Sequence, residues 1–292
     1  MGSSLSRLAF NLLVPIGKPF GGVRPRRMYH ALARRAFTAA EPRRWYRDRW
    51  GHEFHLSPYY WIDRQIIIFG EYDAHLVRLL EHLVRPGSVC LDVGANLGAI
   101  TLQLARIVGR TGVVHSFEPV GAAFDRLKEH VTRNQASPPV TIHQVALSNQ
   151  AGTAEIRCPE QGDFNQGTSS LVNDQARELS RTETIQLETL DAFAERHKLT
   201  KLDLIKLDIQ GAEPLMLRGA ETTLRRFRPI IVTEASREDL VGLGMSLGDY
   251  ITQLEDLGYA VHRIRQGAAA ARVRPTGAFV DGVDNDLVCL PV

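Results

Sequence analysis

Short apolar runs alternate with helix-like segments along most of the chain from about residue 62. The runs have the length of buried strands, and the segments between them carry apolar residues at helical spacing. The predicted strands lie at 61–70, 88–94, 112–119, 140–148, 153–158, 183–188, 202–211, 229–235, 259–264 and 285–291. The predicted helices lie at 71–84, 97–109, 122–134, 190–199, 212–227 and 246–258. Strands that alternate with helices form a mostly parallel sheet covered on both faces, so we expect an α/β fold.

The last two predicted strands follow one another without a helix between them, so one of them is expected to run antiparallel to the rest. Ligands on such sheets bind at the carboxyl ends of the strands, near the point where the strand order reverses. The residues at these ends are 92–98, Glu118, 145–147, 208–211 and Glu234. The polar, irregular segment 160–174 is expected to form a loop or lid that contacts a ligand.

The charge of the chain is unevenly distributed, although its net value is only +2. Residues 1–50 hold 11 Lys/Arg and 2 Asp/Glu, whereas the rest of the chain is net acidic. We therefore expect a basic, partly helical N-terminal extension over residues 1–60 and one α/β domain over residues 61–292. The extension is a candidate for peripheral contact with an anionic membrane, and the alternative is an accessory segment that packs on the domain. The acidic body argues against a nucleic-acid partner.

The cysteines and histidines indicate neither a disulfide framework nor a metal site. Cys90, Cys158 and Cys289 are far apart in the sequence and have no C-x-x-C spacing, so we expect a cytoplasmic protein, with membrane association through its extension as an option. The segment "GHEFHL" at 51–56 lacks the spacing of a zinc-binding helix, and no pair of closely spaced carboxylates suggests magnesium. No metal is predicted.

The segment "VCLDVGANLGAIT" at 89–101 predicts a strand that turns sharply into a helix. A dinucleotide site needs G-x-G-x-x-G, but the equivalent positions here are Gly94, Asn96 and Ala99. A phosphate-binding loop would end in G-K-[ST], which is absent. The turn "DVGANLG" instead resembles that of class I S-adenosylmethionine-dependent methyltransferases, where glycines admit the cofactor and a free helix N-terminus faces its carboxylate. By itself this turn is also compatible with an ordinary α/β core.

A second segment, "LDLIKLDIQGAEPLMLRGA" at 202–220, resembles the signature of the FkbM family of S-adenosylmethionine-dependent methyltransferases. Further matching motifs follow the family's order, among them "FEP", "VALSNQAG", "GTSSL" and "RPIIVTEAS". The resemblance covers about three-quarters of the chain and implies a Rossmann-like sheet of seven strands, six parallel and one antiparallel. Gln210 departs from the pattern, because the family usually has a glutamate there. The basic extension lies outside the resemblance.

The resemblance and the strand ends together define the candidate site. The expected contacts to S-adenosyl-L-methionine are Asp92, Gly94, Ala95, Asn96, Gly98, Glu118, Pro119, Val145, Ala146 and Asp208. Glu118 is suited to accept hydrogen bonds from both ribose hydroxyls. Asp208 is the first choice for accepting the proton of the acceptor hydroxyl, with Glu234 as the second. Lys206 and Glu213 complete the catalytic candidates, and each is equally well explained as a partner in an ion pair or as a helix-start acid.

The expected reaction is in-line transfer of a methyl group to a hydroxyl of a sugar, glycolipid or natural product. Two classes of protein remain as alternatives. One is an NAD-dependent oxidoreductase, which the missing middle glycine disfavours. The other is a non-catalytic scaffold that docks on a membrane. The presence of Asp92, Asn96, Glu118 and Asp208 disfavours it, because these residues indicate an intact site.

Overall fold

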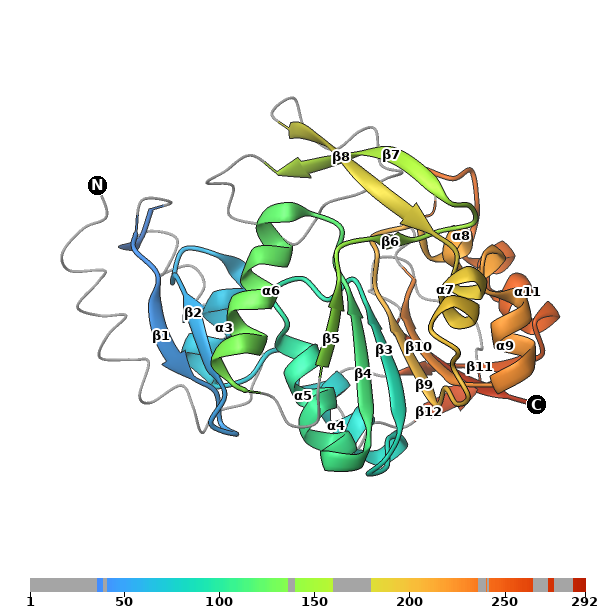
Figure 1. Cartoon of the computed structure of the whole chain (residues 1–292), viewed down its shortest axis with the longest axis horizontal. Helices are drawn as coiled ribbons and strands as arrows, with labels where there is room; N and C mark the ends of the chain where they lie inside the picture. The colour runs from blue at the N-terminus through green and yellow to red at the C-terminus, as the bar shows by residue number, and fades with distance from the viewer. Residues whose placement is uncertain are drawn as a thin grey trace. The chain divides into compact units, whose positions relative to one another are not determined.

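The computed structural model describes residues 36–38, 41–135, 140–159, 180–235, 240, 242–264, 273–275 and 286–292. Within this part, the chain forms two compact units. The smaller unit combines the N-terminal residues up to Ala74 with residues 132–135 and 159, and the larger unit holds nearly all the rest. Most elements of both are labelled in Figure 1. The predicted domain boundary after residue 60 stays a prediction.

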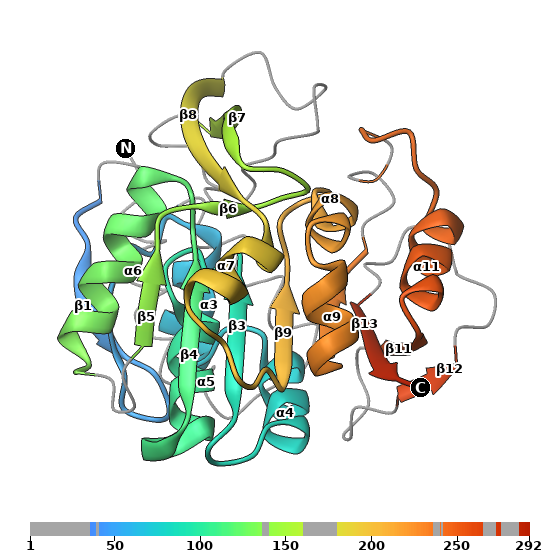
Figure 2. The same cartoon turned by 45° about the vertical axis from the view of Figure 1, so that its right-hand side comes forward.

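An eight-stranded sheet forms the centre of the larger unit (Figure 2). Its strands, in spatial order, are β12 (Val273–Pro275), β11 (Tyr259–Ile264), β13 (Asp286–Pro291), β10 (Ile230–Glu234), β9 (Leu204–Leu207), β3 (Val89–Val93), β4 (Val113–Phe117) and β5 (Val140–His143). The pairs from β10 to β5 are parallel, and β13 is antiparallel to both of its neighbours. The predicted sheet of seven strands with one antiparallel strand is confirmed. The three residues of β12 add an eighth strand at one edge.

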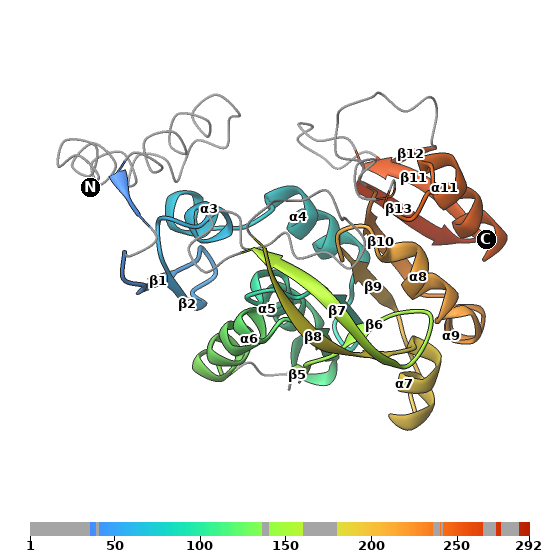
Figure 3. The same ribbon diagram turned by 90° about the horizontal axis from the view of Figure 1, so that it is seen from above.

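Helices cover both faces of this sheet, as expected for parallel strands that are buried on both sides. Figure 3 shows one group of helices on each side. The first group is α4 (Ala74–Leu83), α5 (Ala99–Val108) and α6 (Gly121–Arg133), and the short η1 (Gly109–Thr111) follows α5. The second group is α7 (Leu190–Arg196), α8 (Glu213–Arg218), α9 (Glu221–Phe227) and α11 (Leu247–Asp256). The largest buried apolar cluster joins this second group to the sheet.

Two predicted elements are each divided in the structure. The helix expected over 212–227 is broken into α8 and α9 at Gly219, where a Cβ would overlap the backbone oxygen of Ser148. The strand expected over 140–148 is divided into β5 and β6 (Ala146–Leu147). The latter joins a separate three-stranded sheet with β8 (Ser180–Glu188) and β7 (Gly152–Pro159). A distant backbone segment approaches closely at Gly219, and β6 pairs with β8 instead of continuing the main sheet. The predicted lid at 160–174 lies outside the described residues.

Among its described residues, the smaller unit contains a hairpin and the helix α3. Strands β1 (Arg44–Arg47) and β2 (Glu53–Leu56) pair antiparallel, and α3 spans Trp61–Phe69. The prediction of a strand at 61–70 is wrong, because an apolar run of this length does not distinguish a buried strand from a buried helix. Asp63, in the first turn of α3, accepts a hydrogen bond from the Ser57 N–H, and Gly70 ends the helix at φ 73°.

The basic extension lies mostly outside the described residues, so its predicted helix and its role are not placed by the structure. Among the residues that are described, no helix has the length and apolar character needed to cross a bilayer. Cys90, Cys158 and Cys289 are buried free thiols.

Candidate functional site

The chain turns sharply between β3 and α5, and three residues of the turn have positive φ. These are Gly94 at 80°, Asn96 at 48° and Gly98 at 90°. A Cβ on Gly94 would overlap the backbone oxygen of Asp208, and one on Gly98 would lie 2.7 Å from Leu127 Cδ1. Both glycines are therefore required by close packing of the chain against itself, in addition to their backbone conformation. Contact of these glycines with a ligand stays a prediction.

Asp92 is fully buried next to this turn and connects three elements. Its Oδ2 accepts a hydrogen bond of 2.6 Å from Thr101 on α5, and Thr101 Oγ1 lies 3.0 Å from Ser116 Oγ on β4. Its Oδ1 lies 3.3 Å from Lys206 Nζ, because the two residues are partners in the parallel register of β3 and β9. Asp92 thus holds the end of β3 in place. Its predicted attraction for the cofactor's ammonium group is not tested by these contacts.

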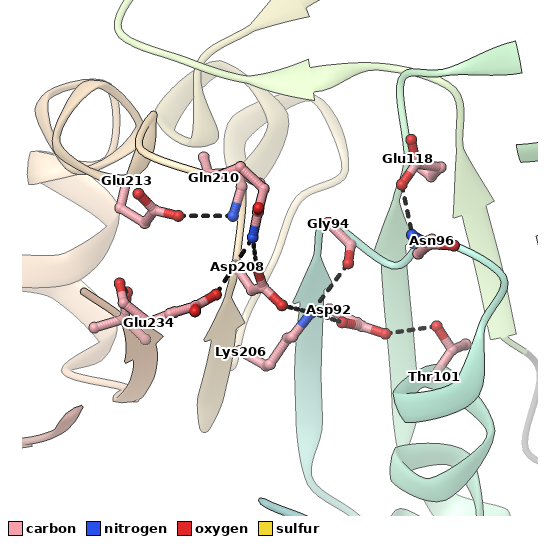
Figure 4. Close-up of polar contacts among 12 residues, drawn as sticks. Asp92, Gly94, Asn96, Thr101, Glu118, Lys206, Asp208, Gln210, Glu213 and Glu234 are labelled. Atoms are coloured by element: carbon pink, nitrogen blue, oxygen red, sulfur yellow. Dashed lines mark hydrogen bonds and ion pairs between the residues drawn. The ribbon is translucent and has the colours of Figure 1, made fainter. Parts of the chain in front are cut away.

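Lys206 supplies the buried cation of the site. Its Nζ donates to the Gly94 carbonyl over 3.0 Å and lies 3.3 Å from Asp92 and 3.5 Å from Asp208 (Figure 4). Burial alone would lower the pKa of Lys206, but the adjacent carboxylates outweigh it and the pKa is raised. The ammonium is therefore a permanent charge that ties the turn after β3 to the end of β9. It is a poor proton donor or acceptor near neutral pH.

Asp208 is the partly open carboxylate of this network. It follows β9 directly, and its side chain is 32% exposed, whereas Asp92 is inaccessible. Gln210 Nε2 donates to Asp208 Oδ1 over 3.0 Å and to Glu234 Oε2 over 3.3 Å. The structure therefore brings Asp208, Lys206 and Glu234 together at the carboxyl ends of β9 and β10, as the sequence predicts (Figure 4).

Glu213 supports the loop that carries Asp208. Its two carboxylate oxygens accept hydrogen bonds from the backbone N–H groups of Ile209, at 2.7 Å, and Gly211, at 2.9 Å. Burial raises its pKa to about 7, although these hydrogen bonds act in the opposite direction. The geometry favours a positioning role for Glu213. A direct catalytic role for Glu213 stays a prediction.

Glu118 follows β4 and lies on the other side of the turn from Asp208 (Figure 4). Its Oε2 accepts from the Asn96 N–H and its Oε1 from the Val120 N–H, both at 2.9 Å. Burial raises the pKa of Glu118 to about 7, while these hydrogen bonds lower it. Each oxygen uses one of its roughly two acceptor positions on the backbone, which leaves capacity for further donors.

The remaining predicted cofactor contacts surround Glu118 and the turn. Ala95 is buried, and its N–H donates to the Phe117 carbonyl at the end of β4. Pro119 directly follows Glu118. Val145 packs on the main apolar cluster, and Ala146 begins β6. These positions are compatible with one side of a nucleoside pocket, and their contacts stay predictions.

Two residues of the network were not anticipated from the sequence. Thr101 and Ser116 are both fully buried polar residues next to Asp92. Ser116 is the register partner of Asp92 on β4, so a polar residue inside an apolar strand was the available signal. Thr101 occupies the first turn of α5, where its hydroxyl meets the preceding strand end.

Comparison with known proteins identifies the family. A model of the FkbM methyltransferase domain matches residues 92–261, more than half of the chain. The match begins at Asp92 and includes every residue of the network described above. The chain belongs to this family. It is accordingly a member of a methyltransferase family, and the cofactor of that family is S-adenosylmethionine.

Curated relatives of this FkbM-family protein are distant. It is 26% identical over 204 residues to the 31-O-demethyl-FK506 methyltransferase FkbM of Streptomyces tacrolimicus, covering 61% of this chain and 75% of that protein. It is 27% identical over 176 residues to the 2-O-methyltransferase NoeI of Sinorhizobium fredii, covering 56% and 69%. The crystal structure of methyltransferase FkbM from Methylobacillus flagellatus KT is 19% identical, with a TM-score of 0.45, and covers 71% of this chain. This chain spans only 45% of that protein's length.

Proposed function

We propose that this FkbM-family protein methylates a hydroxyl group of a sugar, glycolipid or other natural product. The observation that carries the proposal is the placement of Asp208. It is a partly exposed carboxylate at the strand end beside the turn after β3, and Lys206 and Gln210 hold it there. A carboxylate fixed in this way is suited to accept a hydroxyl proton. The two curated relatives named above, whose names specify chemistry at oxygen, support the same reaction.

Glu118 and the turn after β3 fit the donor side of this reaction. Glu118 is a buried carboxylate with spare acceptor capacity, which is the chemistry needed to bind two ribose hydroxyls. Asp208 lies on the opposite side of the same turn, next to Gly94. A cofactor whose ribose contacts Glu118 and whose methionine part extends toward β9 would therefore present its reactive end to Asp208.

Bound S-adenosylmethionine supplies a methyl group on a sulfonium, and transfer forms a C–O bond as the C–S bond breaks with its electron pair left on sulfur. The protein's own contribution is to hold the acceptor oxygen in line with that bond. The Asp208 carboxylate takes the proton that the hydroxyl loses and releases it to solvent. Lys206 cannot perform this step, because its ammonium remains protonated and is shared among three oxygens.

The substitution Asp208→Asn tests this proposal. The variant keeps a side chain of the same size but removes the proton acceptor, so we expect the turnover number to fall by about 100-fold or more. Equilibrium dialysis with labelled S-adenosylmethionine should show affinity within a few-fold of the original protein. The matched control is Glu221→Gln, which removes a carboxylate from the exposed first turn of α9. Full turnover of the Asp208→Asn variant would remove Asp208 from the proton-transfer role.

A screen for methyl transfer tests the wider assignment. Labelled cofactor is incubated with neutral glycosides, lipid-linked sugars and phenolic or alcoholic natural products. Transfer to oxygen in at least one class is the expected result. Binding of S-adenosylmethionine without transfer to any hydroxyl would favour a different acceptor atom or the non-catalytic scaffold.

A further inference from the structure

One amide group joins the two carboxylates at the ends of β9 and β10. Gln210 Nε2 donates to Asp208 Oδ1 at 3.0 Å and to Glu234 Oε2 at 3.3 Å. An amide NH₂ carries two hydrogens and no acceptor, so one nitrogen can serve one oxygen of each acid. Figure 4 shows the three side chains converging on this nitrogen. The bridge fixes the two carboxylates relative to each other.

The backbone beneath the bridge is itself held firmly. Gln210 adopts φ 53° and Gly211 φ 97°, both in the left-handed region. The carboxylate of Glu213 binds the N–H groups on either side of Gln210, those of Ile209 and Gly211. A residue with an uncommon conformation, supported on both sides by a buried acid, marks a position where the direction of the side chain matters.

The two carboxylates differ from the buried acids around them in their exposure to solvent. Asp208 is partly exposed and Glu234 is half-buried, whereas Asp92 and Glu213 are buried with their oxygens engaged inside the fold. Each carboxylate offers about four acceptor positions. Adjacent strands run about 4.8 Å apart, so acids at neighbouring strand ends can receive two donors carried on adjacent carbon atoms of one ligand.

We propose that Gln210 is a positioning residue that presents Asp208 and Glu234 together, and that the acceptor they select is a vicinal diol such as a sugar ring. This inference rests on the proposed hydroxyl methylation. Asp208 takes the proton of the reacting hydroxyl, and Glu234 accepts a hydrogen bond from the hydroxyl on the neighbouring carbon. An acceptor without that second hydroxyl leaves Glu234 without its ligand donor and binds in more than one orientation.

Paired acceptors test the inference in the complete protein. Initial rates with labelled cofactor are compared for neutral glycosides and their monodeoxy analogues, with simple alcohols and phenols in the same panel. The expected result is kcat/KM at least 100-fold higher for the diol than for the matched deoxy compound. Equal transfer to diols, deoxy compounds and simple alcohols would overturn the inference and leave hydroxyl methylation standing. Absence of transfer to every hydroxyl would overturn both.

Substitutions separate the two roles. Glu234→Ala should reduce the diol preference to a few-fold and lower kcat/KM mainly through KM, because the second contact is lost while Asp208 remains. Gln210→Met keeps the length of the side chain and removes the donor, so the same loss of preference is expected with S-adenosylmethionine affinity unchanged. The control Glu221→Gln should retain both rate and preference. An undiminished diol preference in Glu234→Ala and Gln210→Met would overturn the assignment.

The pH profile of Gln210→Glu provides a readout that a merely structural residue would not affect. This variant replaces the shared donor with a third carboxylate next to the other two. Mutual repulsion then favours protonation of one member, so the acidic limb of kcat/KM should move to higher pH. An unchanged profile in an otherwise active variant would show that Gln210 does not act through the two acids.

Discussion

At the scale of single residues, the site consists of similar carboxylates that the fold places in different surroundings. Asp92 is buried beside a cation, Glu213 binds backbone N–H groups, and Asp208 remains partly open. Their chemical roles follow from these environments, because burial, neighbouring charge and hydrogen bonds determine whether a carboxylate has a structural or a catalytic role.

Glu118 gives a prediction about the pH dependence of cofactor binding. Its pKa of about 7 is raised by burial, so in the free protein the carboxylate loses its proton near neutral pH. Ribose hydroxyls donate to the ionised form, and binding below pH 7 must therefore expel a proton. We expect the Kd of S-adenosylmethionine, measured by calorimetry, to rise about tenfold between pH 8 and pH 6.

The control for this prediction is Glu118→Gln. The amide has no titrating group, so binding should be weaker at pH 8 and nearly independent of pH over the same interval. A variant that keeps the original affinity and pH dependence would show that Glu118 does not bind the cofactor.

At the scale of elements, the turn after β3 depends on what packs behind it. Gly94 has φ 80°, and the space for its missing Cβ is filled by the backbone oxygen of Asp208. The glycine therefore allows β3 and the β9 loop to approach closely, which brings the turn after β3 and Asp208 together. The same principle divides α8 from α9 at Gly219.

The substitution Gly94→Ala should therefore cost more than its backbone conformation alone explains. We expect a loss of about 2–4 kcal/mol in the free energy of unfolding, measured by denaturant titration, because the methyl group forces β3 and β9 apart. Gly51→Ala is the matched control, since Gly51 has φ 92° and no atom within 4 Å of an added Cβ. That variant should lose only about 1 kcal/mol. Equal losses for the two variants would show that overlap with Asp208 is unimportant.

At the scale of the whole molecule, a partly buried histidine pair makes folding sensitive to acid. His115 Nδ1 and His143 Nε2 lie 3.2 Å apart on adjacent strands, against Phe193 and near His197. Burial, with a smaller effect from the neighbouring histidines, lowers the pKa of both His115 and His143 to about 4. The unfolded chain takes up these protons near pH 6.5 and the folded protein does not, so stability falls between pH 6.5 and pH 4.

The variant His143→Phe isolates this effect. Glu118 and Glu213, with pKa values raised to about 7, stabilise the fold over much of the same interval as pH falls, so the difference between variant and original protein is the informative quantity. We expect the variant to gain roughly 1–2 kcal/mol relative to the original between pH 6.5 and pH 4, after allowance for partial exposure. A pH-independent difference in unfolding free energy would contradict the prediction.

The basic extension gives a second prediction at this scale. Replacing Arg24, Arg26, Arg27, Arg34 and Arg35 with Gln removes five of the 11 basic residues in the first 50. If the extension contacts an anionic surface, flotation with phosphatidylserine vesicles should decrease several-fold and the original protein should dissociate as salt rises. Methyl transfer to a soluble acceptor should be unchanged. Equal flotation of both proteins would end the membrane hypothesis.

The sequence by itself determined the order of most strands and helices, the presence of an antiparallel strand near the end of the chain, and the family. These follow from local periodicity and from short motifs, which act over a few residues. It also identified Asp208, Glu234 and Glu118 as strand-end residues, and Lys206 as a candidate on the strand that ends at Asp208. Its error at 61–70 arose because an apolar run of that length does not distinguish a buried strand from a buried helix. The division at Gly219 lies where the distant backbone of Ser148 approaches the helix.

Only the tertiary structure decided what each site residue contacts. Lys206 and Asp92 are 114 positions apart in the sequence, yet the register of β3 and β9 makes them partners. Gly94 proved to make room for Asp208 within the chain, and Gln210 proved to join Asp208 to Glu234. A local pattern specifies which way a strand-end side chain points, whereas its charge partners and its exposure depend on which strands lie beside it. Strand pairing over such sequence separations is a property of the assembled fold. This pairing makes Asp92 a buried structural carboxylate and leaves Asp208 partly exposed as the candidate base.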